Sequence, residues 1–398
     1  MANLFEGLLV VDFTTMLAGP MVSALLADYG AEVIKIEQNK GGDPTRAFQP
    51  RVDGKHSLTY VIYNRNKRSF AVDAKDPKGL EALKKLIARA DIFVEAFPAG
   101  TIGKLGLGYD VVKQLNPRII MCSLSGFGQT GPYRERPGYD IIAQGLSGLM
   151  DITGESDGPP IRSGTTLGDF VGAYNAFGAI CAALYSRCRT GKGQLVDIAL
   201  LDSLFAMTTG VEFPAVGETF TRTGNHHTVL APYGVYNGRG DSIIIAAVTE
   251  KQWSAVASVM GRPELITDPK FETNNARTQN LKELIRVIEE WLCSCKSVDD
   301  ALDLLIKAGV PSCKVMKPGD TLTDPQLIAR EMVVDLPMPD DVHEPKTIKA
   351  RGNYMKFSDF KPQYKRAPLL GQDEEYVLKM LGYDDDAITE LMSKWGLK

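Results

Sequence analysis

The first two hundred residues alternate between short apolar runs and longer segments with helical spacing. The helical segments show apolar residues three or four positions apart, and Pro77 and Gly30 stand where a helix begins and ends. This order predicts an open, doubly wound α/β sheet of parallel strands with right-handed crossovers. The apolar runs that predict strands lie at residues 8–13, 31–37, 68–73, 91–97, 118–127 and 195–200.

The pattern changes after about residue 217. A polar stretch with little periodicity is followed by a hairpin pattern whose turn lies at residues 237–241, then by three helical stretches and one further strand. These features predict a separate small α+β domain, and two short helices near the end are expected to return to the first domain. The predicted boundaries are a large domain over 1–200, a linker over 201–224, a small domain over 225–325, a linker over 326–350 and a returning segment over 351–398.

Composition narrows the class of protein. The chain has 398 residues, of which 44% are hydrophobic and 24% charged, and its net charge is −4. These values are ordinary for a soluble globular protein and argue against a nucleic-acid or membrane-surface partner. The start of the chain has no basic, apolar leader, and we expect no segment long enough to span a bilayer. A cytoplasmic protein is therefore expected.

Cysteines, histidines and glycines exclude several kinds of site. The six cysteines are scattered without a CxxC pair, so we expect buried free thiols in a reducing compartment. None of the four histidines stands at metal-ligand spacing from a cysteine or carboxylate, so no metal site is expected. The chain lacks GxGxxG and GK[ST] sequences, which argues against a dinucleotide fold of the dehydrogenase type and against a P-loop.

Asp169 stands where a glycine-containing loop over residues 164–168 meets a long helical pattern. One interpretation is a helix N-cap, in which the carboxylate accepts from free backbone N–H groups. The other is a nucleophile that the positive helix end keeps ionised. Residue 172 is glycine rather than Glu or Gln, so a capping box is absent, and the flexible approach leaves room for a ligand.

Ligands in open α/β sheets bind beyond the carboxyl ends of the strands. Three Gly- and Pro-rich loops follow predicted strands there, at residues 14–20, 95–100 and 125–140. These loops are the expected walls of a binding site.

The assembled motifs resemble the class III CoA-transferase family from residue 11 to about 372. The resemblance implies a Rossmann-like large domain built from both ends of the chain, a small central domain, and an interlocked homodimer. The matching segments are DFTTMLAGP, LADYGAEVIKIE, GGDPTR, NRNKRSFAVD, LGLGYD, LNPRII, SGFGQTGPY, PGYDIIAQ, SDGPP, LGDFVGAY, RTGKGQ, VDIALLDS and APLLGQ.

The resemblance also implies a reaction and a set of contacts. In the family the Asp of LGD, here Asp169, attacks an acyl-CoA thioester and then carries the acyl group and CoA in turn, so CoA passes to a free carboxylic acid. The reaction uses the CoA thioester as substrate and needs no permanent cofactor or metal. The positions that match the family's CoA contacts are Leu17, Ala18, Gln38, Val72, Asp73, Ala74, Lys75, Ala96, Phe97, Pro98, Lys104, Pro137, Gly138, Tyr139 and Asp140.

Two alternatives remain open at the sequence level. The same fold hosts α-methylacyl-CoA racemases, which carry His where this chain has Tyr139, and tyrosine is a poor base near neutral pH. A non-catalytic CoA-binding protein is the second alternative, and an intact Asp169 argues against it. The acceptor is expected to be a dicarboxylic or hydroxy acid that Arg46, Arg51 or Arg65 could hold. Oxalate is disfavoured, because the formyl-CoA transferases of the family that this chain resembles close a run of glycines over oxalate, and residues 240–262 lack a GGGG run.

Overall fold

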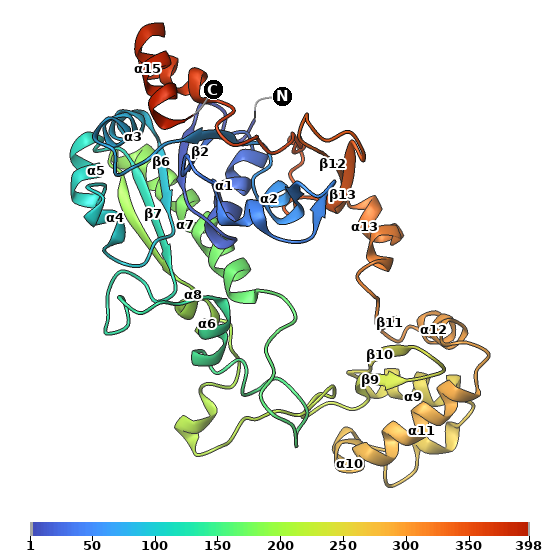
Figure 1. Cartoon of the computed structure of the whole chain (residues 1–398). Helices are drawn as coiled ribbons and strands as arrows, with labels where there is room; N and C mark the ends of the chain where they lie inside the picture. The colour runs from blue at the N-terminus through green and yellow to red at the C-terminus, as the bar shows by residue number, and fades with distance from the viewer. Residues whose placement is uncertain (1–2, 397–398) are drawn as a thin grey trace. The chain divides into compact units, whose positions relative to one another are not determined.

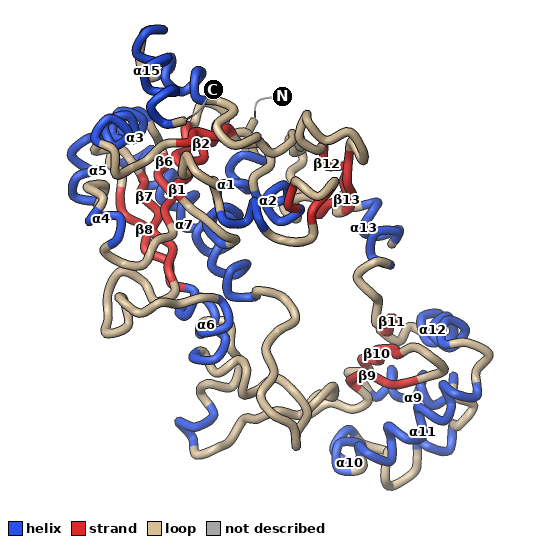
Figure 2. The backbone as a smooth tube through the Cα atoms, viewed as in Figure 1, coloured by secondary structure: helices blue, strands red, loops and turns tan. Residues whose placement is uncertain are grey.

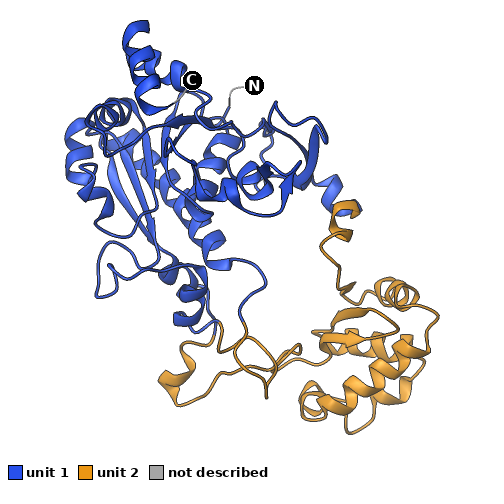
Figure 3. Ribbon diagram, viewed as in Figure 1, with its two compact units in different colours: residues 1–149, 162–209, 325–398 blue, residues 150–161, 210–324 orange. Residues whose placement is uncertain are grey.

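The computed structural model describes residues 3–396 and divides the chain into two compact units (Figure 3). The first unit comprises residues 1–149, 162–209 and 325–398, and the second comprises residues 150–161 and 210–324. The predicted linker over 201–224 is therefore shared between the two units. Residues 326–350, predicted as a linker, instead form part of the first unit.

A six-stranded parallel sheet forms the centre of the first unit (Figure 1). Every strand that the apolar runs predicted is present; five are shorter than predicted, and the last, β8, is shifted by one residue toward the N-terminus. The strand order is β5-β2-β1-β6-β7-β8, so the chain turns from one half of the sheet to the other between β1 and β6. The strands are β1 (Leu9–Phe13), β2 (Glu32–Glu37), β5 (Arg68–Ala71), β6 (Ile92–Glu95), β7 (Ile120–Ser125) and β8 (Gln194–Ala199).

Alternate residues of β1, β2, β6 and β7 enter one of two apolar cores, because successive side chains point to opposite faces of a sheet. Val10 lies in the core with α1 (Ala18–Asp28), α7 (Leu167–Thr190) and α8 (Leu200–Phe205). Val11 lies in the core with α3 (Pro77–Arg89), α5 (Tyr109–Leu115), α14 (Glu374–Met380) and α15 (Asp385–Trp395). Both faces are covered, which explains why the strands read as continuous apolar runs.

The first unit also contains short helices and two antiparallel strand pairs outside the parallel sheet. They are the 3-10 helix η1 (Pro44–Ala47), β3 (Arg51–Val52), β4 (His56–Ser57), α2 (Leu58–Tyr63), α4 (Thr101–Lys104), α6 (Asp140–Leu146), α13 (Pro325–Ala329), β12 (Val333–Pro337) and β13 (Thr347–Arg351). The antiparallel pair β12–β13 occupies most of the segment that the sequence predicted as a second linker.

The second unit has its own core around Trp253. Its sheet has the order β11-β10-β9 and is antiparallel, with the predicted turn between β9 and β10 (Figure 2). The elements are η2 (Phe213–Val216), β9 (Tyr233–Asn237), β10 (Ser242–Ala246), α9 (Glu250–Val259), η3 (Pro263–Ile266), α10 (Asn274–Gln279), α11 (Leu281–Ser294), α12 (Val298–Lys307), β11 (Ser312–Lys314) and η4 (Asp320–Thr323).

Two expectations from composition need correction. Helix α7 is long and apolar enough to cross a membrane by length and composition, whereas we expected no such segment; in the fold it packs against α1, α8 and β7. All six cysteines are unpaired, but Cys188, Cys293 and Cys313 are exposed, so burial holds for only part of the set.

Candidate active site

The carboxyl ends of β1 and β6 form the switch point of the sheet, where a ligand crevice is expected. Asp12 fixes the start of the loop after β1, because its carboxylate accepts hydrogen bonds from the backbone N–H and the hydroxyl of Thr14. Met16 in this loop has a positive φ of 70°, an uncommon backbone conformation for a side chain of its size. Phe13 and Phe97 meet edge to face across the switch point, with ring centroids 5.0 Å apart.

Asp169 is the third residue of α7, and Thr166 is the N-cap. The N-cap interpretation is therefore wrong, although the carboxylate does lie in the first helical turn. Burial, with the charge of Asp140 as the second cause, raises the pKa of Asp169 to about 7. We expected the positive helix end to keep this group fully ionised. Desolvation and a neighbouring carboxylate outweigh the helix end here.

Asp140 fixes the loop that leads to Asp169. One oxygen of its buried carboxylate accepts from the backbone N–H of Gly168 at 2.7 Å, and the other accepts from the side chain of Gln144 at 2.7 Å. The Gln144 oxygen in turn accepts from the backbone N–H of Ser163 at 2.9 Å. Two residues of α6, Asp140 and Gln144, thus hold the two ends of residues 163–168. Sequence reasoning placed Asp140 among the CoA contacts and missed this positioning role.

Two glycines bring the loop before α6 against the loop after β7. A Cβ atom on Gly126 would lie 2.8 Å from the Cα atom of Gly138, so the two backbones touch. Tyr139 follows as the N-cap of α6, and 68% of its surface is exposed. The predicted positions Pro137 to Asp140 therefore sit beside the loop that carries Asp169, as the clamp at Gly168 requires.

The other predicted CoA positions follow the carboxyl ends of neighbouring parallel strands. Leu17 and Ala18 follow β1, Gln38 follows β2, residues 72–75 follow β5, and residues 96–98 follow β6. Because all these strands run in one direction, the positions share one edge of the sheet. The Val72 side chain is buried in the core and leaves only its backbone for a ligand.

The two lysines in this set are free to meet phosphate groups. Lys75 and Lys104 are exposed, and within residues 3–396 neither has a carboxylate partner within 4 Å. The arginines proposed for the acceptor are engaged instead. Arg46 pairs with Glu37 at 2.7 Å, and Arg65 pairs with Asp28 at 2.6 Å, so both serve the fold. Arg51 donates to the carbonyl of Ala47.

Glu95 begins the 95–100 loop that the sequence predicted as a site wall, although the sequence analysis did not single out its side chain. It ends β6 at the switch point, is 1% exposed, and accepts from the backbone N–H of Phe97 at 2.9 Å. Burial raises the pKa of Glu95 to about 7. An acidic residue directly before the Ala96–Pro98 loop was the available signal. Over residues 3–396, the structure contains no group of three or more His, Cys, Asp or Glu side chains that could hold a metal ion.

Comparisons with known proteins identify similar chains. The chain is 37% identical over 392 residues to human succinyl-CoA:glutarate CoA-transferase, covering 98% of this chain and 88% of that protein. It is 34% identical to succinyl-CoA–D-citramalate CoA-transferase from Chloroflexus aurantiacus, covering 97% and 96%. The crystal structure of a CAIB/BAIF family protein from Brucella suis matches with a TM-score of 0.87 at 36% identity, covering 96% and 100%.

The family model described as CoA-transferase family III matches residues 5–374, which confirms the resemblance read from the motifs. The chain belongs to CoA-transferase family III.

Proposed function

We propose that this protein moves CoA from a dicarboxylic acyl-CoA, such as succinyl-CoA, to a second dicarboxylic or hydroxy-dicarboxylic acid, with Asp169 as the covalent carrier. Family membership makes the chain an acyl-CoA:carboxylate CoA-transferase. The observation that carries the proposed mechanism is the raised pKa of Asp169 within a loop clamped by Asp140. The names of the human and Chloroflexus relatives support the substrate class.

The proposed reaction passes through three covalent states of Asp169, two mixed anhydrides and one thioester. Its carboxylate attacks the acyl carbonyl carbon, the C–S bond breaks, and a mixed anhydride and CoA thiolate form. The thiolate attacks the aspartyl carbonyl, which releases the donor acid and leaves an aspartyl-CoA thioester. The acceptor carboxylate attacks this thioester and forms a new anhydride, and the thiolate then attacks the acceptor carbonyl. This last step gives the new acyl-CoA and restores Asp169.

The environment of Asp169 favours these covalent states. A carboxylate beside Asp140 in a partly buried site is disfavoured as an ion, and acylation removes its charge. The acylated forms therefore escape the repulsion that the free carboxylate experiences. Backbone N–H groups of the glycine-rich loops are the available donors for the oxyanions that form during each attack.

This environment sets an expected pH dependence. Only the ionised carboxylate attacks, so single-turnover acylation should rise with pH up to about 7 and level off above about pH 8. Asp140→Asn removes the neighbouring charge while keeping an oxygen for Gly168, so its rising limb should shift to lower pH. Rapid-quench mass spectrometry of the acylated protein measures both profiles. A wild-type rate that is flat down to pH 5 would contradict the assignment.

Substrate choice is tested with a panel of acceptors. Succinyl-CoA is incubated with glutarate, D-citramalate, oxalate or butyrate, and new CoA esters are detected by mass spectrometry. Glutarate or D-citramalate should give product, with butyrate at least about tenfold slower. Absence of any product, together with α-proton exchange in a 2-methylacyl-CoA, would instead establish the racemase alternative.

Assembly as an interlocked homodimer belongs to the same proposal. Ile141 and Leu146 on α6 and Phe205 on α8 are roughly half exposed in a single chain, at 48%, 51% and 56%. Exposed apolar side chains on neighbouring helices are typical of a surface that another chain covers. Light scattering coupled to size-exclusion chromatography should give the mass of two chains, and a monomer at micromolar concentration would exclude this assembly.

A further inference from the structure

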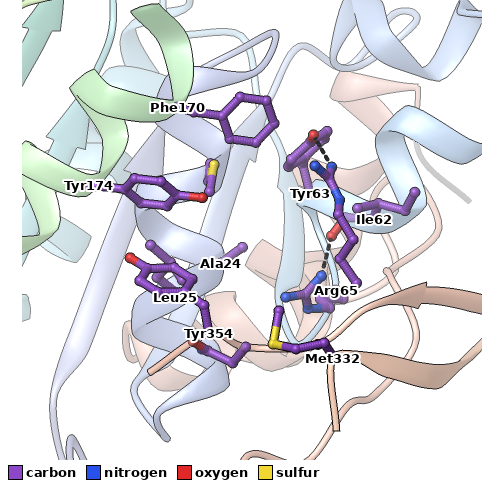
Figure 4. A pocket seen from close by; sticks show the side chains of 13 residues that line it. Ala24, Leu25, Ile62, Tyr63, Arg65, Phe170, Tyr174, Met332 and Tyr354 are labelled. Atoms are coloured by element: carbon purple, nitrogen blue, oxygen red, sulfur yellow. Dashed lines mark hydrogen bonds between the residues drawn. The ribbon is translucent and has the colours of Figure 1, made fainter. Parts of the chain in front are cut away.

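A pocket of about 140 Å³ opens in the first unit between α1, α2, α7 and the segment that follows β13 (Figure 4). Phe170 and Tyr174 from α7 face Ile62 and Tyr63 from α2, and Tyr354 closes one end. A cavity of about 150 Å³ with apolar walls holds a benzene-sized molecule. Asp169 does not line this pocket, so it is separate from the proposed acyl carrier.

The pocket contains a guanidinium group without an acidic partner. Arg351 donates to the hydroxyl of Tyr63 and lies 5.2 Å from the ring centre of Phe170. Across residues 3–396, no carboxylate lies within 4 Å of it. Arg65 lines the same pocket but is neutralised by Asp28, so Arg351 is the cation left available to a ligand.

Asn353 forms part of the pocket wall and is fixed by a buried hydrogen bond. Asn353 lines the pocket and is only 1% exposed, and its side-chain oxygen accepts from the Tyr29 hydroxyl at 2.6 Å. Its side-chain nitrogen is buried without a hydrogen-bond partner and has almost no accessible surface, so a ligand in the pocket cannot contact it. Asn353 therefore shapes the wall of the pocket and leaves recognition of a charged ligand to Arg351.

The charges and polarity of the side chains that line the pocket indicate which class of ligand it would bind. No acidic side chain lines the pocket, whereas Arg351 and the tyrosine hydroxyls can donate. Aromatic, aliphatic and methionine side chains supply the remaining walls. We infer that this pocket binds a small carboxylate with an aromatic or branched apolar body, its charge held by Arg351. This inference stands on the pocket alone and does not depend on the proposed reaction.

Isothermal titration calorimetry with the full chain tests the inference, using benzoate as the probe. Benzyl alcohol has the same body without the charge, and acetate has the charge without the body. Benzoate should bind one per chain, and both comparison probes should bind at least about tenfold more weakly. Arg351→Gln should weaken benzoate binding by a similar factor, because a charged hydrogen bond is lost.

Matched variants make the result specific. Arg286→Gln, on the exposed surface of the second unit, should leave benzoate affinity unchanged, as should Asp169→Ala. Met332→Trp should abolish binding by filling the pocket while Arg351 stays in place. The inference is overturned if folded protein does not bind benzoate, if Arg351→Gln binds it normally, if Asp169→Ala loses it, or if a crystal structure shows a partner chain's side chains filling the pocket.

Discussion

Replacing Asp169 with asparagine should abolish CoA transfer and make the folded protein more stable at pH 8. The amide cannot form the anhydride, so transfer should fall by about 10⁴-fold or more. The stability gain follows from the raised pKa of Asp169, since the folded state holds this carboxylate ionised at a cost when the pH is above about 7. Asparagine removes the charge and the repulsion from Asp140.

The sign of the pH effect makes this prediction specific. Asp169 ionises at about pH 4 in the unfolded chain and at about 7 in the folded protein, so the folded state binds more protons between these values. Wild-type stability therefore falls as the pH rises through this window. Asp169→Asn should gain about 1–3 kcal/mol at pH 8, after allowance for partial solvent screening, and less than half of that at pH 5.

Denaturant unfolding at the two pH values, together with a transfer assay, measures both effects. The control is Asp359→Asn, because Asp359 is exposed at the surface and its replacement should change neither activity nor stability measurably. Residual transfer above about 1% of the wild-type rate would exclude Asp169 as the carrier. A variant that is less stable than wild type at pH 8 would show that Asp169 is mainly structural.

The parallel sheet could be predicted from the sequence, because the burial of each strand is visible in that strand's own residues. Strands buried on both faces must be largely apolar runs, and β1, β2, β6 and β7 show such runs separated by helical spacing. The segment over 326–350 was predicted as a linker, for the opposite reason. Strands β12 and β13 pair only with each other and bury few side chains, so their sequence keeps the mixed polarity of a linker.

The sequence predicted those features of the site that depend on a single motif, and not those that depend on contacts between motifs. Asp169 was identifiable from its own segment, but its pKa depends on Asp140, which lies 29 positions earlier on another helix. Arg46 and Arg65 looked available for a substrate because Glu37 and Asp28 are distant in sequence, and the fold pairs them. Charge pairs between residues that are apart in the sequence, rather than local propensity, determine which charged groups stabilise the fold and which are free to react.

The largest loss of stability is expected from Asp12, the buried carboxylate beneath the switch point. Asp12 accepts hydrogen bonds from Thr14, from Ser23 at 2.6 Å and from Lys67 at 2.9 Å, and neither Asp12 nor Lys67 has exposed side-chain surface. Lys35 also lies close enough to lower the pKa of Asp12, which stands at about 2. Two buried cations therefore depend on this one carboxylate for part of their compensation.

Asp12→Ala should lower the free energy of unfolding by about 3–5 kcal/mol, because it leaves buried lysines without their shared counter-charge and frees the loop after β1. Asp335→Ala is the matched control, since Asp335 pairs with Lys349 at the surface and should cost at most about 1 kcal/mol. The double variant Asp12→Ala with Lys67→Met should recover part of the loss, because the uncompensated cation is removed along with its partner. Urea unfolding of the four proteins measures these differences. If Asp12→Ala lowered the free energy of unfolding no more than Asp335→Ala, the charge network would be dispensable for the fold. If the double variant were no more stable than Asp12→Ala, the lost stability would come from the loop after β1 rather than from the unpaired Lys67.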